Sequence, residues 1–180
     1  MIDRRSVLAL FACAALSACA TGGPAFGPPQ TSQLIAANYA AADSLASGSL
    51  RRISRGAPII VATLVRLEDI GASSNLGRLV SEQIASRLTQ LGYAVPELKL
   101  SGSIFVRSDQ GELLLSQDVR QIAVSYHAQA IVVGTYAVGA DVVYVHVALI
   151  DAASGHAISA YDYFLPMIAQ VRVLLGGKPD

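Results

Sequence analysis

Apolar residues recur at helical spacing in three stretches of the chain. Residues 32–47 place mostly small side chains on one stripe. Residues 76–91 form the clearest stripe, and Gly92 follows at the position of a left-handed C-cap. Residues 116–129 form a shorter stripe whose first residue is serine, a good N-cap. These patterns predict three amphipathic helices, the first of which packs on a larger scaffold.

Runs of β-branched and aromatic residues between and after these helices predict strands. The unbroken apolar run at residues 59–65 is typical of a strand buried on both faces. A second strand begins at residues 93–95, where Pro96 restricts it to an edge. Three further strands, separated by connectors rich in turn residues, are expected to form an antiparallel meander over residues 130–138, 142–150 and 156–165.

Helices interleaved with strands and closed by a meander predict a single α/β (α+β) layer fold. In that fold a mixed sheet ends in an antiparallel three-stranded meander, and the helices lie mainly on one face. We expect four segments along the chain, which are a lipoprotein signal peptide at 1–18, a lipidated cysteine with a Gly/Pro-rich tether at 19–30, the α/β domain at 31–165 and a C-terminal tail at 166–180.

The amino terminus has the three-part order of a secretory signal. Arg4 and Arg5 precede an apolar run at residues 7–16, and small residues follow. A run of this length is about half of the ~20 residues that a helix needs to span a bilayer. It therefore predicts export and not a permanent transmembrane helix.

The next residues, Leu16-Ser17-Ala18-Cys19, resemble the lipobox of bacterial lipoproteins. The resemblance implies cleavage before Cys19, acyl chains on that residue and a stable lipid anchor, because two or more chains hold a protein at a membrane. Alanine stands at residue 20, where aspartate tends to retain lipoproteins in the inner membrane, so the outer membrane is implied. The alternative is an ordinary signal peptide cut after Ala18 or Ala20, with Cys19 a free thiol.

Charge and cysteine content argue against a nucleic-acid partner and against a disulfide within the mature chain. The chain carries 13 basic and 13 acidic residues, and removal of residues 1–18 leaves a formal charge of −1. Because no basic field exists, we expect no nucleic-acid partner. Cys13 leaves with the signal, so the mature chain has no pair of cysteines for a disulfide.

Residues with catalytic or metal-binding chemistry are few. No nucleophile elbow, P-loop, dinucleotide glycine pattern, paired-cysteine motif or zinc-binding helix motif occurs. A zinc or nucleophile site would need His127, His146 and His156 to converge with a carboxylate such as Asp141 or Asp162. We therefore expect no catalytic residue, no metal and no cofactor, and a protein that is not an enzyme.

Aromatic residues on the predicted meander form a candidate interaction face. In the middle strand, Tyr144 and His146 point away from the alternating valines. Tyr161 and Tyr163 lie on the last strand. Cross-strand or core packing is one interpretation of these side chains, and a docking face is the other, since tyrosine is favoured in interfaces.

Several short stretches share their order and spacing with one known family, and they are residues 76–84, 91–93, 111–118, 133–136 and 143–155. With the upstream lipobox, they make the segment from Ser73 to Ala160 resemble the FlgO family of flagellar assembly lipoproteins. None of the stretches is a catalytic signature, so their combination carries the resemblance. It implies a fold related to the amino-terminal domain of TolB and to envelope lipoproteins of the curli-secretion and penicillin-binding-protein-activator kinds.

The function implied by this resemblance is non-enzymatic. An outer-membrane lipoprotein of this kind contributes to assembly or stability of the flagellar apparatus and to motility. The implied partners are the membrane, through Cys19, and flagellar basal-body or other envelope proteins. A second copy of the chain, in a homo-oligomer, is a further possible partner. The alternative is a periplasmic regulatory binding lipoprotein that docks on a cell-envelope enzyme or secretion complex. A curli-type secretion subunit would need lipid-facing strands of about ten residues, and the closing meander alone resembles these.

Overall fold

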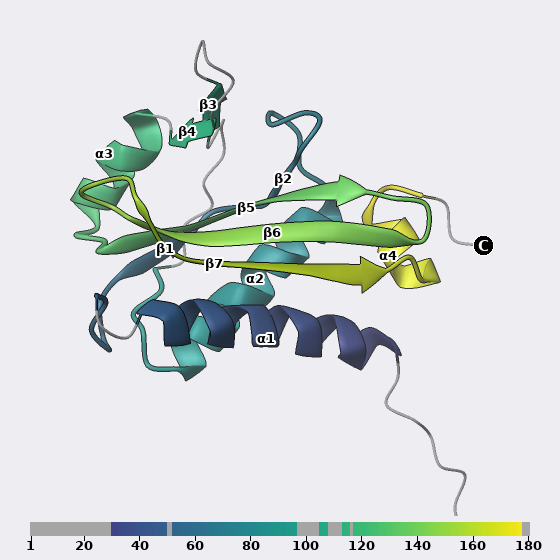
Figure 1. The fold of residues 1–180 in the computed structure, drawn as a ribbon, viewed down its shortest axis with the longest axis horizontal. Helices are drawn as coiled ribbons and strands as arrows, with labels where there is room; N and C mark the ends of the chain where they lie inside the picture. The colour runs from purple at the N-terminus through teal and green to yellow at the C-terminus, as the bar shows by residue number, and fades with distance from the viewer. Residues whose placement is uncertain (1–29, 50–51, 97–104, 108–112, 116, 178–180) are drawn as a thin grey trace, which may run out of the picture.

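A mixed sheet lies at the centre of the protein (Figure 1), whose computed structural model describes residues 30–49, 52–96, 105–107, 113–115 and 117–177. β5 (Ala130–Val138), β6 (Val142–Asp151) and β7 (Ala157–Pro166) form an antiparallel meander, within one residue of the predicted bounds. β1 (Ile59–Val61) and β2 (Val65–Arg66) both pair with β5 in parallel. The strand order is β1-β5-β6-β7, with β2 beside β5. The predicted mixed sheet and its closing meander are confirmed.

β1 and β2 divide a run that the sequence predicts as one strand. The ladder with β5 is interrupted between Val61 and Val65. In this gap the amide of Leu64 donates to Oγ of Ser81 on α2 (Asn75–Gln90), at 2.9 Å. The Ser81 hydroxyl in turn donates to the carbonyl of Gly77 at 2.9 Å. A buried serine on the helix therefore replaces β5 as the partner of this amide.

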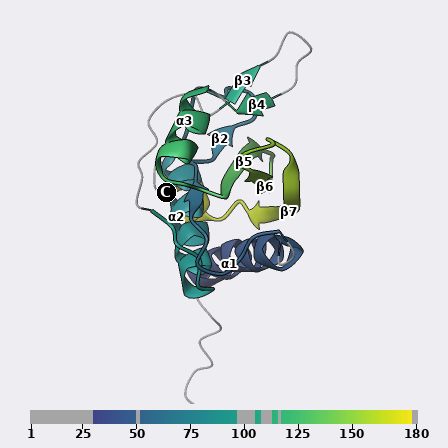
Figure 2. The ribbon, with the colours of Figure 1, turned by 90° about the vertical axis from the view of Figure 1, so that its left-hand side faces the viewer.

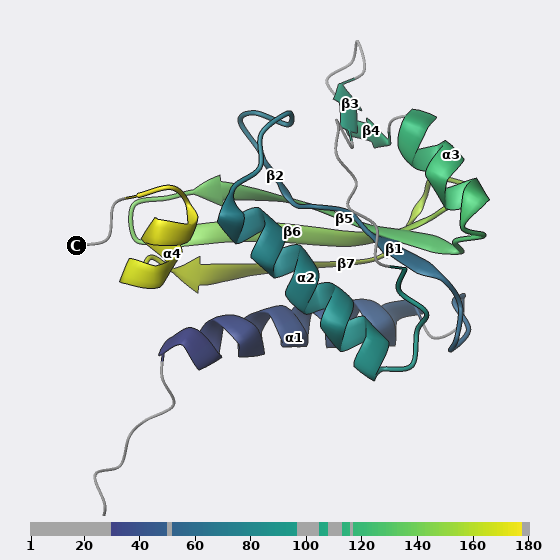
Figure 3. The same cartoon turned by 180° about the vertical axis from the view of Figure 1, so that it is seen from behind.

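Two long helices cover one face of the sheet, which we name the inner face (Figures 2 and 3). α1 (Gln30–Ser49) packs on β7 and on α2, and Figure 3 shows α2 crossing the sheet. The buried positions of α1 include Ala41, Ala42 and Ala46. These small side chains let the helix lie close to the strands, as the predicted stripe of small residues requires.

The ends of α2 follow from its sequence. Ser74 is the N-cap, and its Oγ accepts a hydrogen bond from the amide of Gly77 at 3.2 Å. Gly92 has a φ of +89° just after the helix, and the amide of Tyr93 donates to the carbonyl of Leu88 at 3.1 Å. This is a Schellman ending, which favours glycine because a left-handed conformation is energetically costly for a residue with a Cβ.

α3 (Gln117–Ser125) lies on the opposite, outer face of the sheet. Its Ala123 packs with Ile131 and Ala148 at one end of that face. The helices of the described chain therefore lie mainly on the inner face, as predicted. β3 (Phe105–Arg107) and β4 (Leu113–Leu115) form a separate antiparallel ribbon that stands away from the main sheet in Figure 2.

Some predicted elements differ from the structure. Residues 93–95 make a single bridge, between Ala94 and Pro58, and no strand. Pro96 has no amide proton to donate to the neighbouring segment, so the ladder does not continue past this bridge. α3 ends at Ser125, four residues before its predicted end.

The segment expected to be a tail contains a packed helix. α4 (Ala169–Leu174) buries Val171 to 1% exposure in the inner core. The amide of Met167, just before it, donates to the carbonyl of Asp141 at 2.8 Å. The packed unit therefore extends past the expected domain end at residue 165. α4 has six residues, less than two helical turns, which is too short to show a helical period, and this explains why the sequence pattern missed it.

Candidate functional site

The lipid-anchor site predicted at Cys19 lies outside the described residues, as do the signal peptide and nearly all of the tether. Its lipidation therefore stays a prediction. Within the described ranges, no helix is both long enough and apolar enough to cross a membrane.

The four side chains of the candidate interaction face do not share one side of the sheet. Tyr144 and His146 lie on the outer face. Tyr161 and Tyr163 lie on the inner face, where both pack against the core beneath α1. Their ring centroids are 6.0 Å apart. The four predicted residues therefore form two pairs, one on each face of the sheet.

A β-bulge in the β6–β7 hairpin causes this separation. Next to the turn, Ile150 pairs with Ala157, and the register then shifts by one residue. Had the first register continued, Tyr163 would lie opposite Tyr144 on the outer face. A shift of one residue turns the rest of a strand over, because successive side chains point to opposite faces.

The outer face carries two exposed aromatic side chains and a hydrogen-bonded histidine–aspartate pair. Tyr144 is 60% exposed, and its cross-strand neighbour Phe164 is 61% exposed. In the next pair, His146 Nδ1 lies 2.7 Å from Asp162 Oδ1, with both side chains largely open to solvent. Exposed pairs of this kind contribute little to stability. Phe164 belongs to the aromatic residues of the predicted meander but not to the four chosen for the face, and its position beside Tyr144 depends on the bulge.

The inner pair belongs to a polar network within the fold. The Tyr163 hydroxyl donates to Oδ1 of Asn38 on α1 at 2.6 Å, and Nδ2 of Asn38 donates to Oε1 of Gln83 on α2 at 2.6 Å. Burial, together with a smaller effect of Tyr161, raises the pKa of Tyr163 above its usual range. Tyr163 therefore links β7 to both helices, and it is not free to contact a partner.

The three histidines do not converge. His146 meets Asp162, whereas His127 follows the end of α3 and His156 follows the turn after β6. Among the residues that the structure describes, no group of three or more histidine, cysteine, aspartate or glutamate side chains could hold a metal ion. In the same residues, every buried side-chain nitrogen or oxygen has a hydrogen-bond partner. The alternative site that would unite the histidines is not formed by these residues.

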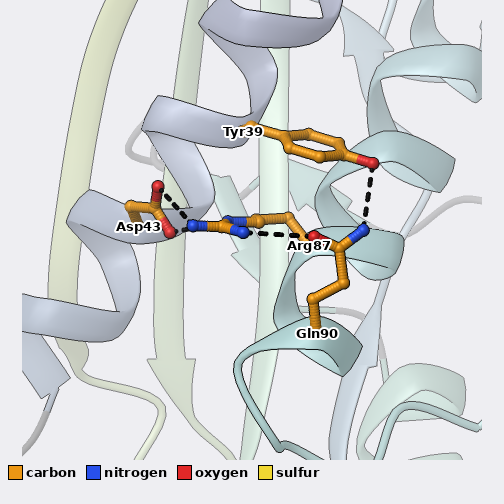
Figure 4. Close-up of polar contacts among 4 residues, drawn as sticks. All are labelled: Tyr39, Asp43, Arg87 and Gln90. Atoms are coloured by element: carbon orange, nitrogen blue, oxygen red, sulfur yellow. Dashed lines mark hydrogen bonds and ion pairs between the residues drawn. The ribbon is translucent and has the colours of Figure 1, made fainter.

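A polar cluster joins α1 to α2 on the surface (Figure 4). The Arg87 guanidinium holds Asp43 in two hydrogen bonds, from Nε at 2.8 Å and from Nη2 at 3.1 Å. Its Nη1 also donates to Gln90 Oε1 at 3.1 Å, and its Cζ lies 5.7 Å from the ring centroid of Tyr39. The Arg87 side chain thus joins α1 to α2, which indicates a structural role.

A cleft between β2, the start of α2 and the end of α4 was not predicted. It has a volume of about 410 Å³ and is lined by Arg66, Arg78, Tyr136 and Leu175 among others. Two of its lining residues are joined by a hydrogen bond, from the Tyr136 hydroxyl to Ser74 Oγ at 2.9 Å. The arginines are twelve residues apart and α4 closes the cleft from the far end of the sequence. No local pattern could have shown that they meet.

Solved structures with a similar fold are known. The C-terminal domain of LpoB from Salmonella enterica has a TM-score of 0.51 at 15% identity, and the match covers 71% of this chain and 96% of that chain. The C-terminal domain of LpoB from Escherichia coli has a TM-score of 0.48 at 12% identity, with the same coverage. A PelC dodecamer from Paraburkholderia phytofirmans has a TM-score of 0.42 at 16% identity, covering 69% and 84%. The Salmonella domain shows a shared α/β fold.

Sequence comparison identifies the family. No curated protein matches the chain. The family model described as FlgO protein matches residues 39–170, from the middle of α1 into α4. This match includes all strands of the main sheet. Because it covers well over half of the sequence, the chain belongs to the FlgO family.

Proposed function

We propose that this chain is a non-enzymatic outer-membrane lipoprotein that contributes to assembly or stability of the flagellar apparatus, and hence to motility. Membership of the FlgO family over residues 39–170 is the observation that carries the proposal. The lipobox ending at Cys19 supports an anchored location. The alanine at residue 20 favours the outer membrane over the inner one.

The described surface suits a protein that works by contact. Exposed Tyr144 and Phe164 lie on the part of the outer face that α3 does not cover. Aromatic side chains of this kind are enriched in interfaces and supply much of their energy. The partners proposed are flagellar basal-body proteins, other envelope proteins or a second copy of the chain.

Anchoring is tested by Cys19→Ser, which removes the sulfur that would carry the acyl chains. The variant should leave the membrane fraction, and the wild-type protein should show the mass of two or three acyl chains at its new amino terminus. Cys13→Ser is the matched control, because that residue is lost with the signal. A wild-type protein without lipid, or a Cys19→Ser protein that stays in the membrane fraction, would contradict the anchor.

The flagellar role is tested by deletion of the gene. Swimming should fail or weaken, and isolated basal bodies should be incomplete or unstable. The wild-type gene should restore both, and the Cys19→Ser gene should not. Normal swimming with intact basal bodies in the deletion strain would rule out the flagellar role and leave the anchor untouched.

A second candidate function is a periplasmic regulatory lipoprotein that docks on a cell-envelope enzyme or secretion complex. The exposed pair of Tyr144 and Phe164 favours docking without specifying a flagellar partner. Co-purification with a peptidoglycan synthase, and not with flagellar rings, would favour this candidate. Tyr144→Ser with Phe164→Ser should then weaken that association while the thermal unfolding temperature stays the same.

A further inference from the structure

We propose that the cleft between β2, α2 and α4 binds an acidic segment of a partner protein, with a carboxylate held by Arg66 and Arg78. This inference rests on the proposed function, in that the chain acts by binding other envelope proteins. It adds the place of contact and the chemistry of the partner.

The cleft has the size and the lining of a binding site for a short peptide segment. Its volume of about 410 Å³ lies within the range of about 300 to 1,000 Å³ that is common for binding pockets. Arg66 and Arg78 supply charge, and Asn75 supplies an amide. Leu174 and Leu175, both partly buried, form an apolar wall from α4. A carboxylate and an apolar side chain of the same segment can be accommodated together.

The charge of the two arginines is not neutralised within the described chain. Neither Arg66 nor Arg78 makes an ion pair there, whereas Arg87 is held by Asp43. Glu82 lies one turn after Arg78 on α2, within reach of an i,i+4 pair, but no such pair forms. Both side chains bring positive charge to the lining of one cleft, which favours an anion there. Guanidinium binds carboxylate in a bidentate geometry, which makes a carboxylate the fitting ligand.

Acidic residues near the cleft do not take this place. Glu68 and Asp69 follow Arg66 in the loop between β2 and α2, and both are exposed. Neither lines the cleft. The Asp69 carboxylate instead accepts a hydrogen bond from the amide of Gly71 at 3.2 Å. The cleft thus presents positive charge toward a partner.

An acidic protein segment fits better than a bare anion. A small anion would contact the arginines and leave the wall of Leu174 and Leu175 unused. A peptide of alternating leucine and glutamate offers both kinds of contact. Nucleic acid would require a much larger basic surface than two side chains.

The test uses the full mature chain, purified from membranes in detergent, and two blocked fluorescent peptides. One peptide alternates leucine and glutamate, and the other alternates leucine and glutamine. Fluorescence anisotropy should show at least tenfold tighter binding of the glutamate peptide to the wild-type protein. R66Q with R78Q should abolish this preference. The matched control, R55Q with R120Q, removes two exposed arginines outside the cleft and should retain it.

A charge reversal keeps the test informative if the double variant is unstable. R78E should bind a leucine–lysine peptide more tightly than the wild-type protein does. Equal binding of the glutamate and glutamine peptides to the wild-type protein would overturn the proposal. So would a preference that survives R66Q with R78Q. Displacement of the glutamate peptide by inorganic phosphate at equal concentration would show a small-anion site and would also overturn it.

Failure of this inference can be separated from failure of the flagellar proposal. A deletion strain that swims normally, with the glutamate preference intact, would remove the flagellar role and leave the cleft as a peptide site. A deletion strain that cannot swim, with no glutamate preference, would remove the cleft proposal alone.

Discussion

Tyr163 shows how the neighbours of one side chain decide its role. As a tyrosine on a terminal strand, it is a natural candidate for an interface. In the structure its hydroxyl donates to the fully buried Asn38, which in turn donates to Gln83. A buried amide oxygen without its donor would cost about 1–3 kcal/mol. The side chain is therefore needed by the fold.

Tyr163→Phe should lower the free energy of unfolding by about 1–2 kcal/mol at pH 8, because Asn38 Oδ1 loses its donor. Burial raises the pKa of Tyr163 above its usual range, so the folded chain keeps this proton after the unfolded chain has released it. The stability that it contributes is present below about pH 10 and is lost as the pH rises further. Urea unfolding at pH 8 and 11 should show the gap between wild type and variant narrowing. A constant gap would contradict this account.

Gly77 shows a second constraint at the scale of one residue. A Cβ at this position would lie 2.5 Å from the carbonyl oxygen of Leu64 and 3.2 Å from Cε1 of Tyr136. Gly77→Ala should destabilise the fold by about 1–2 kcal/mol, although alanine is the better helix former by about 1 kcal/mol. Glu82→Ala, at an exposed position of the same helix, should change stability by less than about 0.5 kcal/mol. Thermal or denaturant unfolding measures both, and a stabilised Gly77→Ala would contradict the close packing.

At the scale of elements, the short α4 completes the inner core. Val171 is 1% exposed, whereas Val173 in the same helix is 41% exposed. Leu34 near the start of α1 and Leu165 at the end of β7 lie beside Val171. A six-residue helix has little stability of its own, so its packing on α2 and on the inner core holds it in place.

Val171→Ala should lower the free energy of unfolding by about 2 kcal/mol through lost apolar burial and a small cavity. Val173→Ala is the matched control in the same helix and should have an effect below about 0.5 kcal/mol. Denaturant unfolding of both variants distinguishes them. Equal effects would mean that α4 does not pack as the structure shows.

The end of α3 contains a strained position. His127 has a φ of +50°, and it is the one non-glycine residue with a positive φ in the described chain. The amide of Ala128 donates to the carbonyl of Ala123 at 2.8 Å, which completes a Schellman ending. His127→Gly should raise the free energy of unfolding by about 1 kcal/mol, because glycine adopts this conformation without a Cβ clash. His156→Gly, outside the helices, should bring no such gain, and a destabilised His127→Gly would contradict the assignment.

At the scale of the whole molecule, the two faces of the sheet differ in their cover. α1, α2 and α4 close the inner face, while α3 covers one end of the outer face. Tyr144 and Phe164 lie on the part of the outer face that α3 leaves uncovered. The cleft lined by Arg66 and Arg78 lies between β2, α2 and α4. The fold thus offers two separate surfaces for contact, one aromatic and one basic.

A chain from residue 30 to residue 177 should fold by itself and unfold in one cooperative transition, because its core is formed by α1, α2, α4 and the sheet. A chain that ends at residue 165, the expected domain boundary, should lose several kcal/mol of stability or fail to fold, since Val171 and its neighbours leave the core. Circular dichroism during heating compares the two. Equal melting temperatures of the two chains would show that the domain ends at residue 165.

Local pattern was sufficient for the elements whose signal is local. The stripe of α2 and its C-terminal end were predicted nearly to the residue, because Gly92 and the apolar period act within a few turns. The meander was predicted because turn residues separate its strands. The interruption of the first parallel strand was not predicted, because it depends on the hydrogen bond from Leu64 to Ser81 on α2. The strand expected at 93–95 is reduced to one bridge, because Pro96 has no amide proton to extend the ladder.

The sequence by itself determined α1, α2, α3 and the closing meander, the anchor motif at Cys19 and the family, because each depends on residues that are close along the chain. Which side chains share a surface was decided by the tertiary structure alone. A one-residue bulge sends Tyr163 inward and brings Phe164 beside Tyr144, and the folding of three distant segments brings Arg66 and Arg78 to one cleft. Strand register and packing set these positions, and neither can be read from the spacing within a single segment.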